Sequence, residues 1–127
     1  LASGKIVLSD RFIDASVAYQ AAGLGVDEAF VREASRFAAD GLQPNRTYML
    51  NLSALESRRR LTERAAAAGA EADLDRIERK PIEYHERVRE AFLRIAEAEP
   101  NRVVLLDATK TVKELSEAIL WDCKRFL

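Results

Sequence analysis

Three short apolar runs alternate with longer amphipathic segments along the chain. The runs cover residues 5–8, 47–52 and 103–107, and polar residues follow each of them. Runs of this length, separated by segments long enough for helical crossovers, are typical of buried strands in a parallel sheet. The pattern therefore predicts an α/β protein with a parallel sheet and helices on its faces.

The segments between the runs carry helix-start and helix-stop signals. Asp27 can cap a helix that Gly41 ends. Pro81 suits the first turn of a later helix, whose predicted apolar face consists of Tyr84, Val88, Phe92 and Ile95. Two capping-box patterns open further helices: Ser53 with Glu56, and Thr111 with Glu114. In the last helix a stripe of apolar spacing predicts the buried face: Val112, Leu115, Ile119, Cys123 and Phe126.

Composition narrows the class of protein. The chain has 127 residues, of which 48% are hydrophobic and 32% charged, so we expect one globular domain or part of one. A net charge of -1 provides no overall attraction to nucleic acid or to an anionic membrane. No apolar run approaches the ~20 residues that a membrane helix needs. The single cysteine, Cys123, cannot form an internal disulfide, so we expect a reducing, cytoplasmic setting.

The first apolar run ends in Ser9-Asp10-Arg11, where chemistry is expected. Ligands of open parallel sheets bind beyond the carboxyl ends of the strands, and the planar guanidinium of Arg11 can bind a phosphate or carboxylate with two hydrogen bonds. In the alternative interpretation, Asp10 and Arg11 cap a helix and pair with each other.

Several linked motifs resemble one family. Asp10-Arg11-Phe12, followed by Ser16 and Ala18-Tyr19-Gln20, resembles the nucleoside-monophosphate-binding segment of thymidylate kinases. Further segments match that family in order and spacing: 41–45, 47–52, 75–78, 85–89 and 103–108. The resemblance implies a three-layer α/β fold of the phosphate-loop nucleoside-monophosphate-kinase type. It also implies transfer of the terminal phosphate of ATP to dTMP with Mg2+, giving dTDP.

The resemblance assigns roles to individual residues. Arg11 would hold the dTMP phosphate, and Asp10 would act in the adjoining polar network, reaching Mg2+ through water. Ser16 would meet the edge of the thymine, Tyr19 would pack near the sugar, and Gln20 would complete the base pocket. The family also forms homodimers through helices, and we expect the interface on residues 28–40, with Phe30 or Phe37 as an anchor.

A lid over the ATP phosphates is expected at about residues 58–78, with Arg60, Arg64 and Arg76 at or in it. The alternative is a charged, solvated helix followed by a surface loop. Residues 65–74 contain no arginine, so the sequence does not identify which arginine reaches the phosphates. Asn45 and Asn51 stand where the family usually has Asp, and we interpret both as structural changes near strand ends.

The family's phosphate loop, Gly-x-x-x-x-Gly-Lys-Ser/Thr, is absent from these 127 residues. We therefore expect the chain to be the carboxyl-terminal part of a single kinase domain whose first two strands lie outside this sequence, and to be inactive alone. One alternative is a kinase for another nucleoside monophosphate. A second is a non-catalytic partner module that retains a nucleotide site and a dimer surface.

Overall fold

The computed structural model describes residues 2–67 and 77–125. Its elements follow one another along the chain as α1 (Ile13–Ser16), the π-helix η1 (Val17–Gly23), α2 (Glu28–Ala38), β1 (Thr47–Asn51), α3 (Ala54–Ala67), α4 (Ile82–Ala98), β2 (Val103–Asp107) and α5 (Val112–Cys123).

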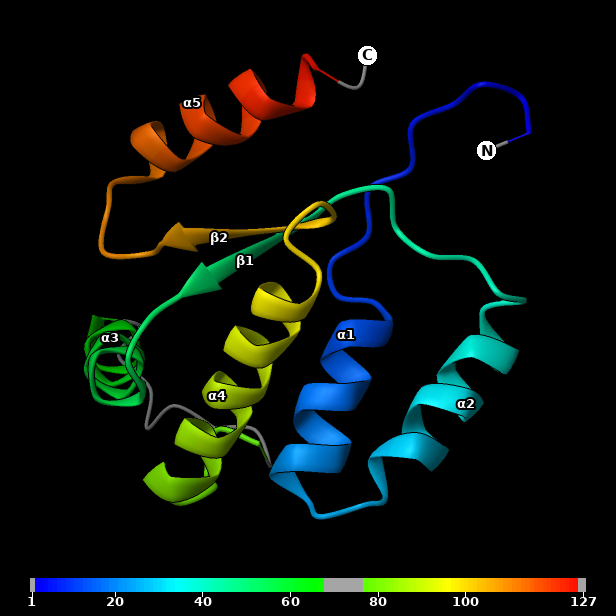
Figure 1. Ribbon diagram of the computed structural model, residues 1–127. Helices are drawn as coiled ribbons and strands as arrows, with labels where there is room; N and C mark the ends of the chain where they lie inside the picture. Colours follow the sequence, from blue (N-terminus) through cyan, green and yellow to red (C-terminus); the bar gives the residue numbers. More distant parts are fainter. Residues whose placement is uncertain (1, 68–76, 126–127) are drawn as a thin grey trace.

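The two strands form a parallel pair between layers of helices. Thr47 is opposite Val103 at one end of the pair, and Asn51 is opposite Asp107 at the other. Helix α5 lies on one side of the strands, and α1, α2 and α4 lie on the other (Figure 1). The predicted α/β architecture with a parallel sheet is confirmed, and two of the three predicted strands are present.

The prediction of a third strand at residues 5–8 is wrong. This run has no regular secondary structure, and Ile6, Val7 and Leu8 are 67%, 65% and 91% exposed. A strand requires a neighbour that accepts and donates its ladder hydrogen bonds. In the described part of the chain the sheet consists of β1 and β2 alone, so apolar composition is not sufficient to make residues 5–8 a strand.

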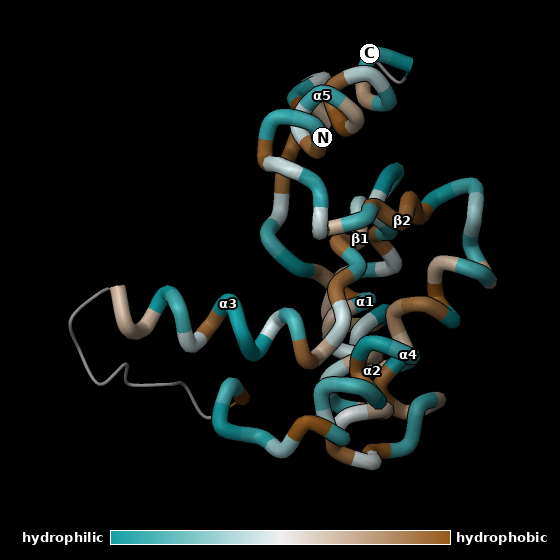
Figure 2. The backbone as a smooth tube through the Cα atoms, turned by 90° about the vertical axis from the view of Figure 1, so that its left-hand side faces the viewer, coloured by the Kyte–Doolittle hydropathy of each residue, from teal (hydrophilic) through white to brown (hydrophobic). Residues whose placement is uncertain are grey.

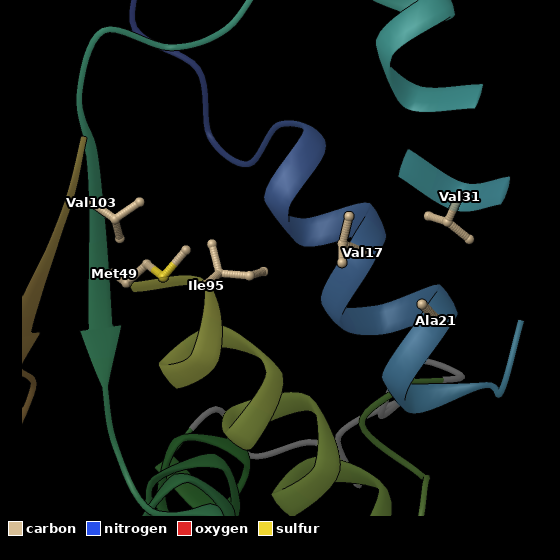
Figure 3. Packing of buried hydrophobic residues seen from close by; sticks show 6 residues of the cluster. All are labelled: Val17, Ala21, Val31, Met49, Ile95 and Val103. Carbon is tan, nitrogen blue, oxygen red and sulfur yellow. The ribbon is translucent and has the colours of Figure 1, made fainter. Parts of the chain in front are cut away.

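The hydrophobic core lies between the sheet and the helices on one of its faces. Figure 3 shows its main cluster, which consists of Val17, Ala21, Val31, Met49, Ile95 and Val103. A second cluster joins η1 to α4 through Ala18, Tyr84, Val88 and Ala91. Tyr84 and Val88 confirm the apolar face predicted for α4, and Tyr84 is only 1% exposed.

The local helix signals are largely confirmed. The Asp27 carboxylate accepts a hydrogen bond from the Phe30 amide at 2.8 Å, and Gly41 beyond α2 has a φ of 71°. Thr111 and Glu114 form both halves of a capping box. Ser53 accepts from the Glu56 amide at 3.2 Å, but the Glu56 carboxylate binds Arg59 and Arg60 instead of returning to the helix start.

A polar cluster docks α5 on the sheet. Arg46 donates to both carboxylate oxygens of Asp122, at 2.7 and 2.8 Å, and the Tyr48 hydroxyl donates to the same carboxylate at 2.8 Å. Tyr48 also lies 3.2 Å from the Cys123 sulfur. The hydrogen bonds from Arg46 and then Tyr48 hold the pKa of Asp122 below its usual range. Burial, aided by hydrogen bonds to Cys123 and Asp122, raises the pKa of Tyr48.

The apolar stripe predicted for α5 is confirmed only in its middle. Leu115, Ile119 and Cys123 are half-buried. Val112, at the start of the helix, is 82% exposed, and Phe126 lies outside the described residues. None of the helices in residues 2–67 and 77–125 combines the length and the apolar composition of a membrane-spanning helix.

Candidate functional site

Arg11 sits in a tight turn immediately before α1. Its φ is 67°, in the left-handed region that non-glycine residues seldom adopt. The Ser9 hydroxyl donates to the Arg11 carbonyl oxygen at 2.8 Å and closes the turn. Unusual backbone of this kind costs about 1–3 kcal/mol and clusters at ligand sites. The turn leaves the side chains of Asp10 and Arg11 exposed.

Arg11 and Tyr19 are brought together by the fold. The Arg11 guanidinium lies 5.1 Å from the centre of the Tyr19 ring, which is cation–π distance. Tyr19 in turn packs edge-on against Phe92 of α4, with ring centres 5.9 Å apart. Ser16, three residues before Tyr19, is half-buried. Gln20, the residue after Tyr19, is exposed. Ser16, Tyr19 and Gln20 therefore lie on one short helical segment supported by α4, directly after the turn that carries Asp10 and Arg11.

The sequence patterns did not indicate that Tyr19 and Gln20 belong to a π-helix. A π-helix is wider than an α-helix, and such turns often occur at functional sites. Helix η1 ends at Gly23, where a Cβ atom would lie 2.6 Å from the Tyr84 ring. Arg87 of α4 donates to the carbonyl oxygens of Ala22 and Gly23, at 3.3 and 3.2 Å. Tyr84 and Arg87 of α4 thus pack against the carboxyl-terminal end of η1 and bind its last carbonyl groups.

Arg60 and Arg64 of the predicted lid lie on α3, which extends away from the other helices (Figure 2). Arg60 donates to the Glu56 carboxylate at 3.0 Å and to the Ala108 carbonyl oxygen at 2.9 Å. Arg64 pairs with Glu78 at 3.1 Å. Hydrogen bonds from Arg59 and then Arg60 lower the pKa of Glu56 to about 2. Arg76 lies outside the described residues.

The carboxyl ends of the strands carry polar groups that the sequence patterns did not single out as a site. Asn51 at the end of β1 accepts from Arg89 Nε at 3.0 Å. Asp107 at the end of β2 accepts from the amide and hydroxyl of Thr109, which lower the pKa of Asp107. The position of these polar residues at the ends of apolar strands is the signal that could have found them. Arg60 and Arg89 therefore border the same edge of the sheet.

The opposite, amino-terminal edge of the strands holds a buried ion pair. Arg102 donates two hydrogen bonds of 2.8 Å to the Asp14 carboxylate, and Arg102 Nη1 also donates to the Thr47 hydroxyl at 3.0 Å. This pair anchors α1 beside the starts of β1 and β2. Nothing in the pattern of residue types indicated it, because its members are 88 positions apart in the chain.

An open pocket lies along α2, away from the residues predicted to bind nucleotide. All its lining residues come from this helix and the turn after it, with Phe30, Phe37 and Gly41 among them. Phe30 and Phe37 are 66% and 87% exposed, while Val31 on the other side of the helix is buried in the core. The apolar surface that the sequence placed on residues 28–40 is thus exposed in this chain.

Helices on both faces of a parallel sheet, with arginines beside the carboxyl ends of its strands, are typical of α/β proteins that bind phosphorylated ligands. Comparison with known proteins narrows this class. The family model for thymidylate kinase matches residues 1–119. The chain therefore belongs to the thymidylate kinase family, as its motifs indicated.

Relatives named thymidylate kinase align with nearly all of the chain. The protein of Exiguobacterium sibiricum is 41% identical over 127 residues, which are 100% of this chain and 57% of that protein. The protein of Clavibacter michiganensis subsp. michiganensis is 43% identical over 116 residues, 91% of this chain and 52% of that protein. The protein of Sulfurihydrogenibium sp. is 39% identical over 125 residues, 98% of this chain and 57% of that protein. The chain thus spans about half the length of these relatives.

Proposed function

We propose that the whole protein to which this chain belongs transfers the terminal phosphate of ATP to dTMP, giving dTDP. Family membership supports the reaction class. The observation that carries the proposal for this chain is the exposed Arg11 guanidinium, held over Tyr19 by a left-handed turn. A preorganised guanidinium binds a phosphate with charge-assisted hydrogen bonds and little loss of side-chain entropy.

In this proposal the acceptor site follows the segment from Asp10 to η1. Arg11 binds the phosphate of dTMP, and the Tyr19 ring packs beside the sugar. Ser16 and Gln20 contact the base. Because Tyr19 already contacts Arg11 and Phe92, its ring has a defined position before the nucleotide arrives.

The donor side is assigned to the arginines of the lid. Phosphoryl transfer depends on positioning and on cations around the transferred group. Arg60 and Arg64 have carboxylate partners here, Glu56 and Glu78, and Arg64 remains 74% exposed. We assign these two, with Arg76, to the ATP phosphates. For Arg64, exchanging Glu78 for a phosphate would accompany closure of the lid.

Magnesium fits this proposal through Asp10. In residues 2–67 and 77–125 no group of three His, Cys, Asp or Glu side chains could enclose a metal ion. Magnesium at a phosphoryl-transfer site is usually held by one or two carboxylates together with phosphate oxygens and waters. The exposed Asp10 carboxylate suits such a contact through water. When bound, the ion would neutralise charge on the phosphates of ATP.

We also propose that the protein is a homodimer through α2 and that it works in the cytoplasm. The exposed Phe30 and Phe37 form an apolar surface on a helix whose opposite side is already packed. Such a surface is typical of an interface between subunits. The half-buried free thiol of Cys123 is consistent with a reducing compartment.

The test is a coupled ADP-release assay on the full-length protein with ATP, Mg2+ and each of dTMP, dUMP, CMP, AMP and GMP. We expect turnover with dTMP to exceed that with the other acceptors. Equal or greater turnover with another acceptor would overturn the substrate assignment. Residues 1–127 alone serve as the control and are expected to be inactive, because they contain no phosphate-loop motif.

A further inference from the structure

Arg102 uses all three of its side-chain nitrogens in contacts with Asp14 and Glu99. Both terminal nitrogens of Arg102 donate to Asp14 at 2.8 Å, and its third donor, Nε, reaches Glu99 at 2.7 Å. The Asp14 and Arg102 side chains are 10% and 13% exposed. A fork-to-fork pair of this kind fixes orientation as well as distance.

Arg102 is itself held rigidly. Its amide donates to the Glu99 carbonyl oxygen at 3.0 Å, and its carbonyl oxygen accepts from the Thr47 amide at 2.9 Å. The Thr47 hydroxyl lies within 3.4 Å of Asp14 and also accepts from Arg102. Arg102 therefore ties Asp14 to the end of α4 and to the first residue of β1.

Asp14 follows the turn that presents Arg11 by only a few residues. Phe12, at the start of α1, provides no side-chain cap. Within the described residues, the Asp14 ion pair is therefore a direct polar link between the Arg11 turn and the start of the sheet, beside the packing of α1 and η1 on α2 and α4.

A buried ion pair adds little stability over an apolar pair of equal volume, since both charges lose their hydration. What the pair does provide is a fixed orientation of the two side chains. We propose that Asp14 and Arg102 are positioning residues for the acceptor site: the pair sets where Arg11 stands, and hence how the phosphate of the acceptor nucleotide is held. This inference rests on the proposed function.

The full-length protein with Asp14→Asn tests the inference directly. This variant keeps the shape of the side chain but removes its charge. We expect the Kd for dTMP to rise about 5- to 10-fold, no more than removal of Arg11 itself would cause, because a displaced guanidinium loses the geometry of its charge-assisted hydrogen bonds. The Kd for ATP should stay within about twofold, and binding of thymidine, which has no phosphate for Arg11, should change less than binding of dTMP. Equal losses for dTMP and thymidine would overturn the assignment.

A second variant separates positioning from stability. In the double variant Asp14→Leu with Arg102→Met, apolar side chains of similar volume replace both charges, a change that often preserves or increases stability. We expect normal thermal unfolding with weakened dTMP binding. Wild-type affinity for dTMP in this variant would overturn the inference.

The matched control is a second partly buried Arg–Asp pair, Arg46 with Asp122, which attaches α5 to the sheet. Helix α5 lies on the face opposite α1 (Figure 1). Asp122→Asn should lower thermal stability but leave the Kd for dTMP unchanged. If Asp14→Asn and Asp122→Asn change dTMP binding in proportion to their loss of stability, the Asp14 pair is structural only and the inference fails. The wild-type assay decides the proposed function separately, since a protein that phosphorylates dTMP can still fail every variant test.

Discussion

The Tyr48 hydroxyl donates to the Asp122 carboxylate at 2.8 Å and joins the first strand to the last helix. Arg46 binds both oxygens of the same carboxylate from the residue just before that strand. Helix α5 has exposed apolar residues at Val112, Leu120 and Trp121. Its attachment to the sheet therefore relies on this charged cluster as well as on apolar packing.

The cluster predicts a loss of stability in acid. Because the pKa of Asp122 is lower in the folded state, its stabilising effect is fully present above the unfolded value of about 3.9. This stabilisation is lost as the pH falls through the lower pKa that Asp122 has in the folded protein. We expect the thermal midpoint of the wild type to fall more steeply between pH 5 and pH 3 than that of Asp122→Asn. Parallel curves for the two proteins, measured by calorimetry, would contradict the role of this carboxylate.

Arg11→Ala in the full-length protein should weaken binding of dTMP about tenfold or more. The variant removes a charge-assisted contact to phosphate worth about 1.5–3 kcal/mol. ATP affinity should be nearly unchanged, as measured by isothermal titration calorimetry with each nucleotide. Arg32→Ala is the control, because Arg32 is also an exposed arginine but pairs with Glu28 on α2. Unchanged dTMP affinity in Arg11→Ala would remove Arg11 from the acceptor site.

The surface of α2 should control assembly. Phe37→Glu places a charge where we expect a second subunit to bury an aromatic ring, so sedimentation should show a shift from dimer to monomer. Phe30→Glu should act in the same direction. Val112→Glu is a suitable control, since Val112 is 82% exposed on α5 and Phe37 is 87% exposed on α2. A dimer that survives both phenylalanine substitutions would place the interface elsewhere.

Gly23→Ala should destabilise the protein through Tyr84. The added Cβ would lie 2.6 Å from a carbon of that ring, and the buried ring has little room to move. Forced overpacking of this kind costs about 1–3 kcal/mol in the free energy of unfolding. Denaturant unfolding should show a smaller cost for the same substitution in a Tyr84→Leu background. An equal cost in both backgrounds would mean that the clash does not cause the effect.

The sequence by itself determined the features that depend on neighbouring residues. The cap at Asp27 and the capping box at Thr111 are set by side chains within three residues of the helix start, so their patterns were sufficient. The apolar face of α4 followed from helical periodicity. The motif from Asp10 to Gln20 also indicated the family, because linked residue types at fixed spacing are specific.

Tertiary structure decided the features that depend on distant partners. Residues 5–8 are as apolar as the strands at 47–51 and 103–107, yet only the latter two pair, since a strand is defined by its neighbour. The contacts between Asp14 and Arg102, and between Tyr48 and Asp122, join residues 88 and 74 positions apart. Residue type alone does not reveal such partners, because any buried acid can pair with any arginine until the fold brings one of them within reach.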